Sequence, residues 1–142
     1  MSVADALTWS TAPPRAAEYV ALRAATGLGP RSEASARRAL PQSLHAVCVR
    51  DGDRLVAMGR AVGDGGCFVL LTDMAVAPDW QGRGLGRALL NRLIAWCETA
   101  LPPDCHISLV SSERAAPLYR SAGFRPCRGM DRYADPARPS PP

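Results

Sequence analysis

Three glycines alternate with bulky residues in "DWQGRGLGRALLN", residues 79–91, directly ahead of a leucine-rich segment. Glycine weakens regular structure, so three of them this close together need a physical reason. A helix that begins here would leave backbone N–H groups unpaired and would carry a partial positive charge at its N-terminus. Glycines let a diphosphate approach those N–H groups without meeting a Cβ, and Arg83 and Arg87 add charge beside them.

Two better-known phosphate motifs do not fit this stretch. A G-x-G-x-x-G fingerprint needs a sixth-position glycine, but Arg87 stands there when counted from Gly82, and Leu89 when counted from Gly84. A P-loop needs a lysine, and all 17 basic residues of the chain are arginines. A simple tight turn would need one glycine. The sequence therefore favours a diphosphate cradle between a strand and a helix.

The bulk composition is that of an ordinary globular domain: 142 residues, 47% hydrophobic, with a net charge of +4. We expect one domain over residues 1–133 and a proline-rich, disordered tail over residues 134–142. The arginines are scattered, which speaks against nucleic-acid binding, although a mildly basic surface attracts an anionic cofactor. The five cysteines form no C-x-x-C pair, so we expect free thiols and no metal site. No apolar run approaches ~20 residues and no signal-peptide pattern opens the chain, which predicts a cytoplasmic protein that does not enter membranes.

The elements that must position the glycines follow from hydrophobic periodicity. Leucines on one face predict a helix over residues 84–99, and apolar runs around Asp51–Asp53 predict a hairpin within residues 44–62. Further strands are expected at residues 6–10, 67–76, 105–110 and 127–133, and further helices at residues 14–25, 32–40 and 113–122. The strands at 67–76 and 105–110 flank a helix and should pair in parallel, which gives an α+β fold with a mixed sheet.

With these motifs in place, the sequence resembles the GNAT N-acetyltransferase superfamily. Gln81-Gly82-Arg83-Gly84-Leu85-Gly86 matches the family's Q/R-x-x-G-x-G/A motif, and "AAPLYRSAGF" (115–124) is similar to its A-x-x-L-Y-x-x-x-G-F helix. The resemblance covers residues of about 67 to 125 well. It implies a mixed sheet of about 6–7 strands, splayed between two central parallel strands and flanked by about 4 helices.

The resemblance also implies acetyl-CoA as the cosubstrate and assigns residues to it. The glycine loop would bind the pyrophosphate, the splayed strand would pair with the pantetheine arm, and Ser112 and Tyr119 would also contact the cofactor. The Met74 N–H would polarise the acetyl carbonyl, as an oxyanion hole does. The expected cofactor-binding residues are Met74, Ala75, Val76, Gln81, Gly82, Arg83, Gly84, Leu85, Gly86, Arg87, Ser112 and Tyr119.

Tyr119 matches the family's tyrosine near the CoA sulfur, where a phenol can protonate the leaving thiolate. Two interpretations of Asp73 stay open: it relays the proton of the attacking amine, or it is a hydrogen-bonded structural carboxylate. His45, His106 and a water chain are the other candidates for the base.

Four positions depart from the family or leave a choice. Ser112 stands where many members have an asparagine, although a serine can also cap the helix. Pro117 is tolerated only in a first helical turn, so that helix is expected to start late. Arg60 and Asp64 belong to a stretch similar to glucosamine-phosphate and plant-type arylalkylamine N-acetyltransferases. They either line the acceptor site or form an ion pair that supports a turn.

The sequence thus predicts an acetyl-CoA-dependent enzyme that acetylates a primary amine of a small molecule by direct attack in a ternary complex. One alternative is acetylation of a protein N-terminus or lysine. A second is a CoA-binding or sensing module without turnover, which could dispense with Tyr119. The acceptor, the acyl-chain preference and the oligomeric state, including a homodimer, stay undetermined at this level.

Overall fold

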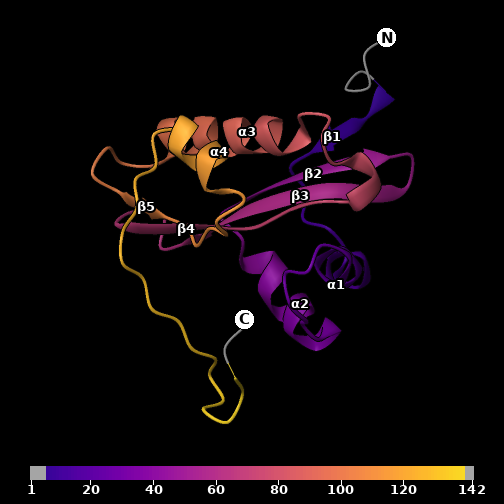
Figure 1. Ribbon diagram of the computed structural model, residues 1–142, viewed down its shortest axis with the longest axis horizontal. Coiled ribbons are helices and arrows are strands. Elements are labelled where there is room, and N and C mark those ends of the chain that lie inside the picture. The colour runs from indigo at the N-terminus through magenta and orange to yellow at the C-terminus, as the bar shows by residue number, and fades with distance from the viewer. Residues whose placement is uncertain (1–5, 140–142) are drawn as a thin grey trace. The chain divides into compact units, whose positions relative to one another are not determined.

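A five-stranded sheet organises the chain up to Leu109 in the computed structural model, which describes residues 6–139 (Figure 1). Its order is β1-β2-β3-β4-β5, antiparallel from β1 to β4 and parallel between β4 and β5. The strands are β1 (Thr8–Ser10), β2 (His45–Asp51), β3 (Arg54–Gly63), β4 (Phe68–Val76) and β5 (His106–Ser108). The predicted hairpin is therefore β2–β3, and the predicted parallel pair is β4–β5.

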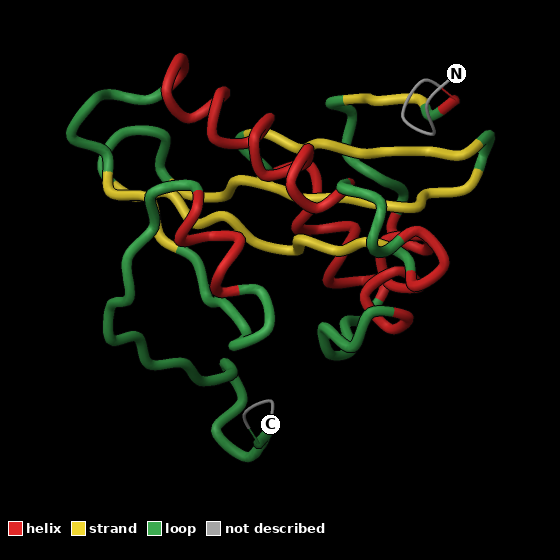
Figure 2. The backbone as a smooth tube through the Cα atoms, turned by 45° about the horizontal axis from the view of Figure 1, so that its top comes forward, coloured by secondary structure: helices red, strands yellow, loops and turns green. Residues whose placement is uncertain are grey.

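Helices cover both faces of this sheet. Figure 2 shows α3 (Leu85–Ala100) along one face, with α1 (Ala16–Ala25) and α2 (Glu33–Ala39) on the other. Two short 3₁₀ turns, η2 (Leu40–Gln42) and η3 (Pro78–Trp80), follow α2 and β4. The leucine periodicity explains α3, since its buried side chains are Leu85, Leu89, Leu90, Leu93 and Cys97. They pack on a sheet whose fully buried residues include Val47, Cys48, Val49, Val56, Met58 and Val69.

The residues from Val110 onward form a second compact unit, which is described by itself. Its one helix among the described residues is α4 (Ala116–Ser121), with Pro117 in the first turn, so the helix does start late, as expected. The prediction of one domain over residues 1–133 stays a prediction, and the last three residues of the proline-rich tail lie outside the described range. Within residues 6–139, no helix is long and apolar enough to cross a membrane.

The α+β class is confirmed, but two details of the expected sheet are wrong. The described sheet has five strands instead of 6–7, and its parallel pair lies at one end and not at the centre. The strand expected at residues 127–133 is absent, and this segment is coil. Its apolar residues Cys127, Met130 and Tyr133 recur every third position, so they cannot line one face of a strand, and Gly129 weakens it further.

Candidate active site

The glycine-rich turn lies directly before α3, as the sequence predicts, and the short 3₁₀ turn η3 separates it from β4. Gly82 and Gly84 both have left-handed backbones, with φ of 77° and 84°, and Gly84 is the N-cap residue of α3. A Cβ on either glycine would meet no atom within 4 Å. Their backbone conformation explains the glycines here, and the space beside them is open. The first N–H groups of a 16-residue helix face that space, together with the positive end of its dipole.

The side chains of Gln81, Arg83 and Arg87 around this turn are exposed, whereas Leu85 is buried and anchors α3 in the core. The Arg83 guanidinium lies 4.6 Å from the centre of the Trp80 ring, so it is held at the turn by a cation–π contact. The Gln81 side-chain amide donates a hydrogen bond of 2.9 Å to the Val76 carbonyl oxygen. Gln81 therefore links the glycine turn to the end of β4, and Arg87 stands exposed in the first turn of α3.

The second half of β4 has one open edge. β5 pairs only with Phe68–Leu70, so it leaves the rest of β4 without a partner on that side in the described chain. On the other side, the Ala77 N–H donates to the Val56 carbonyl oxygen at 2.7 Å. Because antiparallel residues alternate between the two edges, the N–H and C=O of Val76 point away from β3, toward the open edge. A ligand that carries amide groups could pair with this backbone.

β4 also contains a bulge at Asp73 and Met74. The cross-strand pairs Met58–Ala75 and Arg60–Thr72 show that β4 advances three residues while β3 advances two. Asp73 has φ of 58° and is the only non-glycine residue with positive φ in the described chain. Opposite the bulge, a Cβ on Gly59 would lie 2.6 Å from the Met74 sulfur, so a side chain at this position would force Met74 to shift.

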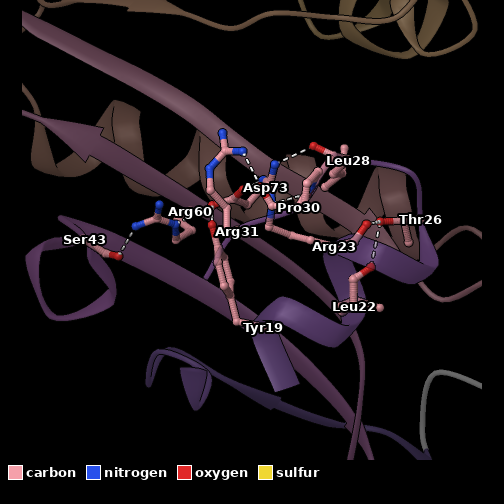
Figure 3. Close-up of polar contacts among 11 residues, drawn as sticks. Tyr19, Leu22, Arg23, Thr26, Leu28, Pro30, Arg31, Ser43, Arg60 and Asp73 are labelled. Atoms are coloured by element: carbon pink, nitrogen blue, oxygen red, sulfur yellow. Dashed lines mark hydrogen bonds and ion pairs between the residues drawn. The ribbon is translucent and has the colours of Figure 1, made fainter. Parts of the chain in front are cut away.

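The Asp73 carboxylate is buried and accepts hydrogen bonds from three side chains (Figure 3). The Tyr19 hydroxyl donates to Oδ2 at 2.8 Å, Arg60 Nε donates to the same oxygen at 2.6 Å, and Arg23 Nη1 donates to Oδ1. The side chains of Asp73, Arg23 and Arg60 are only 3%, 7% and 10% exposed. Burial and the Asp73 charge raise the pKa of Tyr19, which keeps its phenol a donor. We call these four residues the Asp73 clamp.

The hydrogen bonds of the Asp73 clamp contribute more free energy than the left-handed backbone of Asp73 costs. A left-handed non-glycine residue costs roughly 1–2 kcal/mol, although aspartate tolerates this conformation better than most residues. A hydrogen bond to a charged group contributes about 1.5–3 kcal/mol, so one of the three offsets the backbone cost. The contacts are those of the structural carboxylate that the sequence left open; a catalytic role for Asp73 stays a prediction.

Ser112 and Tyr119, the site residues expected after β5, belong to the second unit. Ser112 Oγ accepts a hydrogen bond of 3.2 Å from the Ala115 N–H, so it closes the turn before α4. Tyr119 packs edge-on against Phe124, with ring centres 6.2 Å apart. Burial raises the pKa of Tyr119, so the phenol is protonated at neutral pH and can donate a proton.

The remaining candidates take other places. His45 stacks on Trp96, with ring centres 4.9 Å apart, and burial lowers its pKa. His106 is exposed on β5, where its ring lies edge-on to Phe68. Asp64 accepts hydrogen bonds from the N–H groups of Gly66, Cys67 and Phe68, and so supports the turn alone.

Of the two interpretations of Arg60 and Asp64, the ion pair between them is therefore wrong, because Arg60 pairs with Asp73. Sequence reasoning also missed Tyr19 and Arg23. Their spacing of four residues places both on one face of α1, and that apolar face is the available signal that Arg23 is buried. No three His, Cys, Asp or Glu side chains within residues 6–139 form a group that could hold a metal.

Comparison with known proteins agrees with the motifs. The Acetyltransferase (GNAT) domain family matches residues 41–126. Serotonin N-acetyltransferase 2, chloroplastic, from Oryza sativa subsp. japonica is 36% identical over 105 residues, which cover 71% of this chain and 52% of that protein. Glucosamine 6-phosphate N-acetyltransferase from Trypanosoma brucei brucei is 40% identical over 68 residues, covering 47% of this chain and 40% of that protein.

The chain thus spans about half or less of the length of these curated relatives. Among solved structures, a probable acetyltransferase from meticillin-resistant Staphylococcus aureus superposes with a TM-score of 0.85 at 30% identity, covering 89% of this chain and 98% of that one. The family match extends over more than half of the chain and includes β4, the glycine turn and α4. The chain belongs to the GNAT acetyltransferase family.

Proposed function

We propose that this protein transfers an acetyl group from acetyl-CoA to a primary amine of a small molecule, by direct attack in a ternary complex. The observation that carries the proposal is the open edge of β4 beside the glycine turn. Both features lie in the first unit and are joined by the hydrogen bond from Gln81 to Val76. An extended arm with amide groups, ending in a diphosphate, matches an unpaired strand edge that leads to a helix N-terminus.

The cofactor would lie along this path. The pyrophosphate would bind the main-chain N–H groups at the start of α3, with Arg83 and Arg87 as supporting charges. The pantetheine arm would lie along Met74, Ala75 and Val76, and its amides would pair with the outward backbone groups of this stretch, such as those of Val76. The Met74 N–H, beside the bulge, would donate to the acetyl oxygen as negative charge develops on it.

The transfer then needs two proton movements. The amine nitrogen attacks the thioester carbonyl carbon, the C–N bond forms and the C–S bond breaks. The nitrogen gives up a proton and the departing thiolate gains one. Tyr119, with its raised pKa, is the proposed acid for the thiolate. We assign the base to water, because the Asp73 carboxylate is already occupied by three donors.

The acceptor is proposed only as a class. The two curated relatives are named for an arylalkylamine and for an amino-sugar phosphate, and both acceptors carry a primary amine. We therefore expect a small primary amine. The cytoplasmic location stays a prediction, and the oligomeric state stays open.

The decisive experiment mixes the purified protein with acetyl-CoA and a panel of primary amines, and follows the release of free thiol. The panel should contain arylalkylamines, amino sugars and their phosphates, and peptides with a free N-terminus or a lysine. Thermal shift with CoA runs alongside. Turnover with a small amine supports the proposal, and turnover with peptides alone favours a protein acetyltransferase. Stabilisation by CoA without any turnover favours a binding module, and no stabilisation contradicts acetyl-CoA as the cosubstrate.

Tyr119→Phe tests the acid. We expect kcat to fall by a factor of about 10²–10⁴, the range for loss of general acid catalysis, with little change in the Kd for acetyl-CoA. Tyr133→Phe removes a hydroxyl from the same unit and is the matched control. An unchanged kcat in Tyr119→Phe would remove the acid assignment and leave the rest of the proposal intact.

A further inference from the structure

The bulge in β4 changes which face of the sheet Asp73 occupies. Antiparallel partners share a face, so Thr72 lies on the same face as Arg60, with which it pairs. Arg60 reaches the Asp73 carboxylate, so Asp73 is on this face as well. Two consecutive residues of β4 therefore point to one face, which regular alternation forbids and a bulge with a left-handed residue allows.

Met74 consequently points to the opposite face. A Cβ on Gly59 would lie 2.6 Å from the Met74 sulfur and 2.9 Å from Leu93 Cδ1, so Met74 crosses over Gly59 on the α3 side. With regular alternation after Thr72, Asp73 itself would point toward α3. Its charge would then be buried among leucines, far from both arginines. The bulge and the ion pairs of Asp73 thus require each other.

The two arginines are themselves held in place. Arg23 Nε donates to the Gly29 carbonyl oxygen at 3.2 Å, and its Nη2 donates to the Leu28 carbonyl oxygen. Arg60 Nη1 donates to Ser43 Oγ at 3.0 Å. The Tyr19 ring lies between the two guanidiniums, 5.9 Å and 5.6 Å from their central carbons. The clamp is therefore a rigid support, built from α1 and β3, for a single residue of β4.

We propose that the Asp73 clamp is a positioning device for the cofactor strand: it holds the β4 bulge, which sets the direction of the Met74 N–H and of the open edge of β4. The inference rests on the proposed function, since it assumes that acetyl-CoA binds along this edge. In this role Asp73 neither takes nor gives a proton during the reaction. It acts through the backbone of its neighbour, and the residues of α1 act on the cofactor without touching it.

The test separates positioning from proton transfer. Asp73→Asn keeps the shape of the side chain but leaves two guanidiniums without a counter-charge, and Asp73→Gly removes the carboxylate while tolerating the positive φ. We expect both variants to raise the Kd for acetyl-CoA, measured by calorimetry without acceptor, at least tenfold. The pH profile of the remaining kcat should keep its shape. An unchanged Kd, together with a lost acidic limb in the kcat profile, would overturn the proposal and make Asp73 the base.

A milder variant covers the case in which Asp73 variants fold poorly. Tyr19→Phe removes one donor and keeps the ring between the arginines, so we expect a two- to fivefold higher Kd. Amide hydrogen exchange of Thr72–Val76 without ligand should accelerate in Tyr19→Phe, whereas exchange in α3 should stay as in the wild type. Unchanged exchange and an unchanged Kd in this variant would overturn the proposal.

Glu18→Gln is the matched control, because Glu18 also joins α1 to the sheet, through Arg50 of β2. It should lower the melting temperature and leave the Kd for acetyl-CoA as it is. An equal rise of Kd in this control would show that any loosening of α1 has the same effect, and would overturn the specific role of Asp73. Failure of the wild-type protein to bind acetyl-CoA would contradict the proposed function itself. That result is distinct from wild-type binding that the Asp73 variants retain, which overturns the clamp alone.

Discussion

Two charge clusters tie α1 to the sheet, and they differ in what they hold. Glu18 of α1 and Arg50 of β2 form a two-pronged ion pair, with Oε–Nη distances of 2.5 and 2.8 Å. The register of β2 against β3 shifts between Val49 and Arg50, but neither residue has a positive φ. The side chains of Glu18 and Arg50 are 14% and 23% exposed, whereas that of Asp73, in the clamp, is 3% exposed. Asp73 also has the unusual backbone. The first cluster fastens one element to another, and the second fixes a local backbone geometry.

The comparison matters because the two kinds of cluster should fail differently. Loss of the Glu18–Arg50 ion pair loosens α1, which keeps its apolar contacts. Loss of a partner in the clamp leaves buried charge uncompensated, next to the part of β4 that we propose binds the cofactor. Stability and ligand affinity should therefore separate between variants of the two clusters.

The largest expected effect is that of Asp73→Ala. Removal of the carboxylate leaves Arg23 and Arg60 buried without their counter-charge, and breaking a buried pair in this way costs about 3–5 kcal/mol. Urea unfolding measures the loss. Glu18→Ala provides the comparison and should lose less stability. If Glu18→Ala is as destabilising as Asp73→Ala, the distinction between the two clusters is wrong.

Gly59→Ala approaches the bulge from the other face. The new Cβ would lie 2.6 Å from the Met74 sulfur and 2.9 Å from Leu93 Cδ1, and such overpacking costs about 1–3 kcal/mol. Because Met74 must move, we also expect the KM for acetyl-CoA to rise. Gly66→Ala is the matched control, since its Cβ would meet only an Asp64 oxygen at 3.9 Å. Equal KM values in the two variants would show that Gly59 does not affect acetyl-CoA binding through β4.

The contribution of the Glu18–Arg50 ion pair to stability should depend on pH in the acid range. The hydrogen bonds from Arg50 lower the pKa of Glu18 from 4.5 to about 2. A carboxylate with a lowered pKa in the folded state stabilises the protein fully above 4.5, and this contribution is lost as the pH falls toward 2. Glu18→Gln should therefore flatten the fall of the melting temperature between about pH 4.5 and pH 2. Curves for variant and wild type that stay parallel through this range would contradict the assignment.

The smallest effect is expected at Arg54 and Asp79, a third ion pair, with two contacts of 2.6 and 2.8 Å, whose side chains are 54% and 58% exposed. Both charges are open to solvent, where ion pairs are screened by water and salt. Asp79→Ala should leave the urea midpoint unchanged within error. A clear destabilisation that disappears at high salt would show that even this exposed ion pair stabilises the folded protein.

The sequence predicts what depends on neighbours along the chain. The leucine spacing locates α3 to within one residue at each end, and the turn around Gly52 locates the hairpin of β2 and β3. Gly82 and Gly84 also have the left-handed conformations that a strand-to-helix turn of glycines suggests. These features rest on local backbone preference and on periodic burial, both of which can be read from a short window.

The sequence does not predict what depends on distant partners. Arg23 and Asp73 are 50 residues apart, and no local pattern pairs them. Arg60 stands four positions from Asp64, and this closeness suggested the wrong partner, because the strand directs Arg60 across to β4. The sequence does show Asp73 as a carboxylate in an apolar strand. Its charge had to be neutralised by something, and only the fold shows that α1 and β3 supply it.

The hydrogen-bonding of Arg23 has a consequence for protein engineering. This side chain joins the loop after α1, through the carbonyls of Leu28 and Gly29, to the carboxylate of Asp73. A chimera that takes its first helix and loop from another protein would therefore fail unless it also carries an arginine and a tyrosine four residues apart. The first quarter of the chain is not an exchangeable module, and any library that varies it should keep Tyr19 and Arg23 constant.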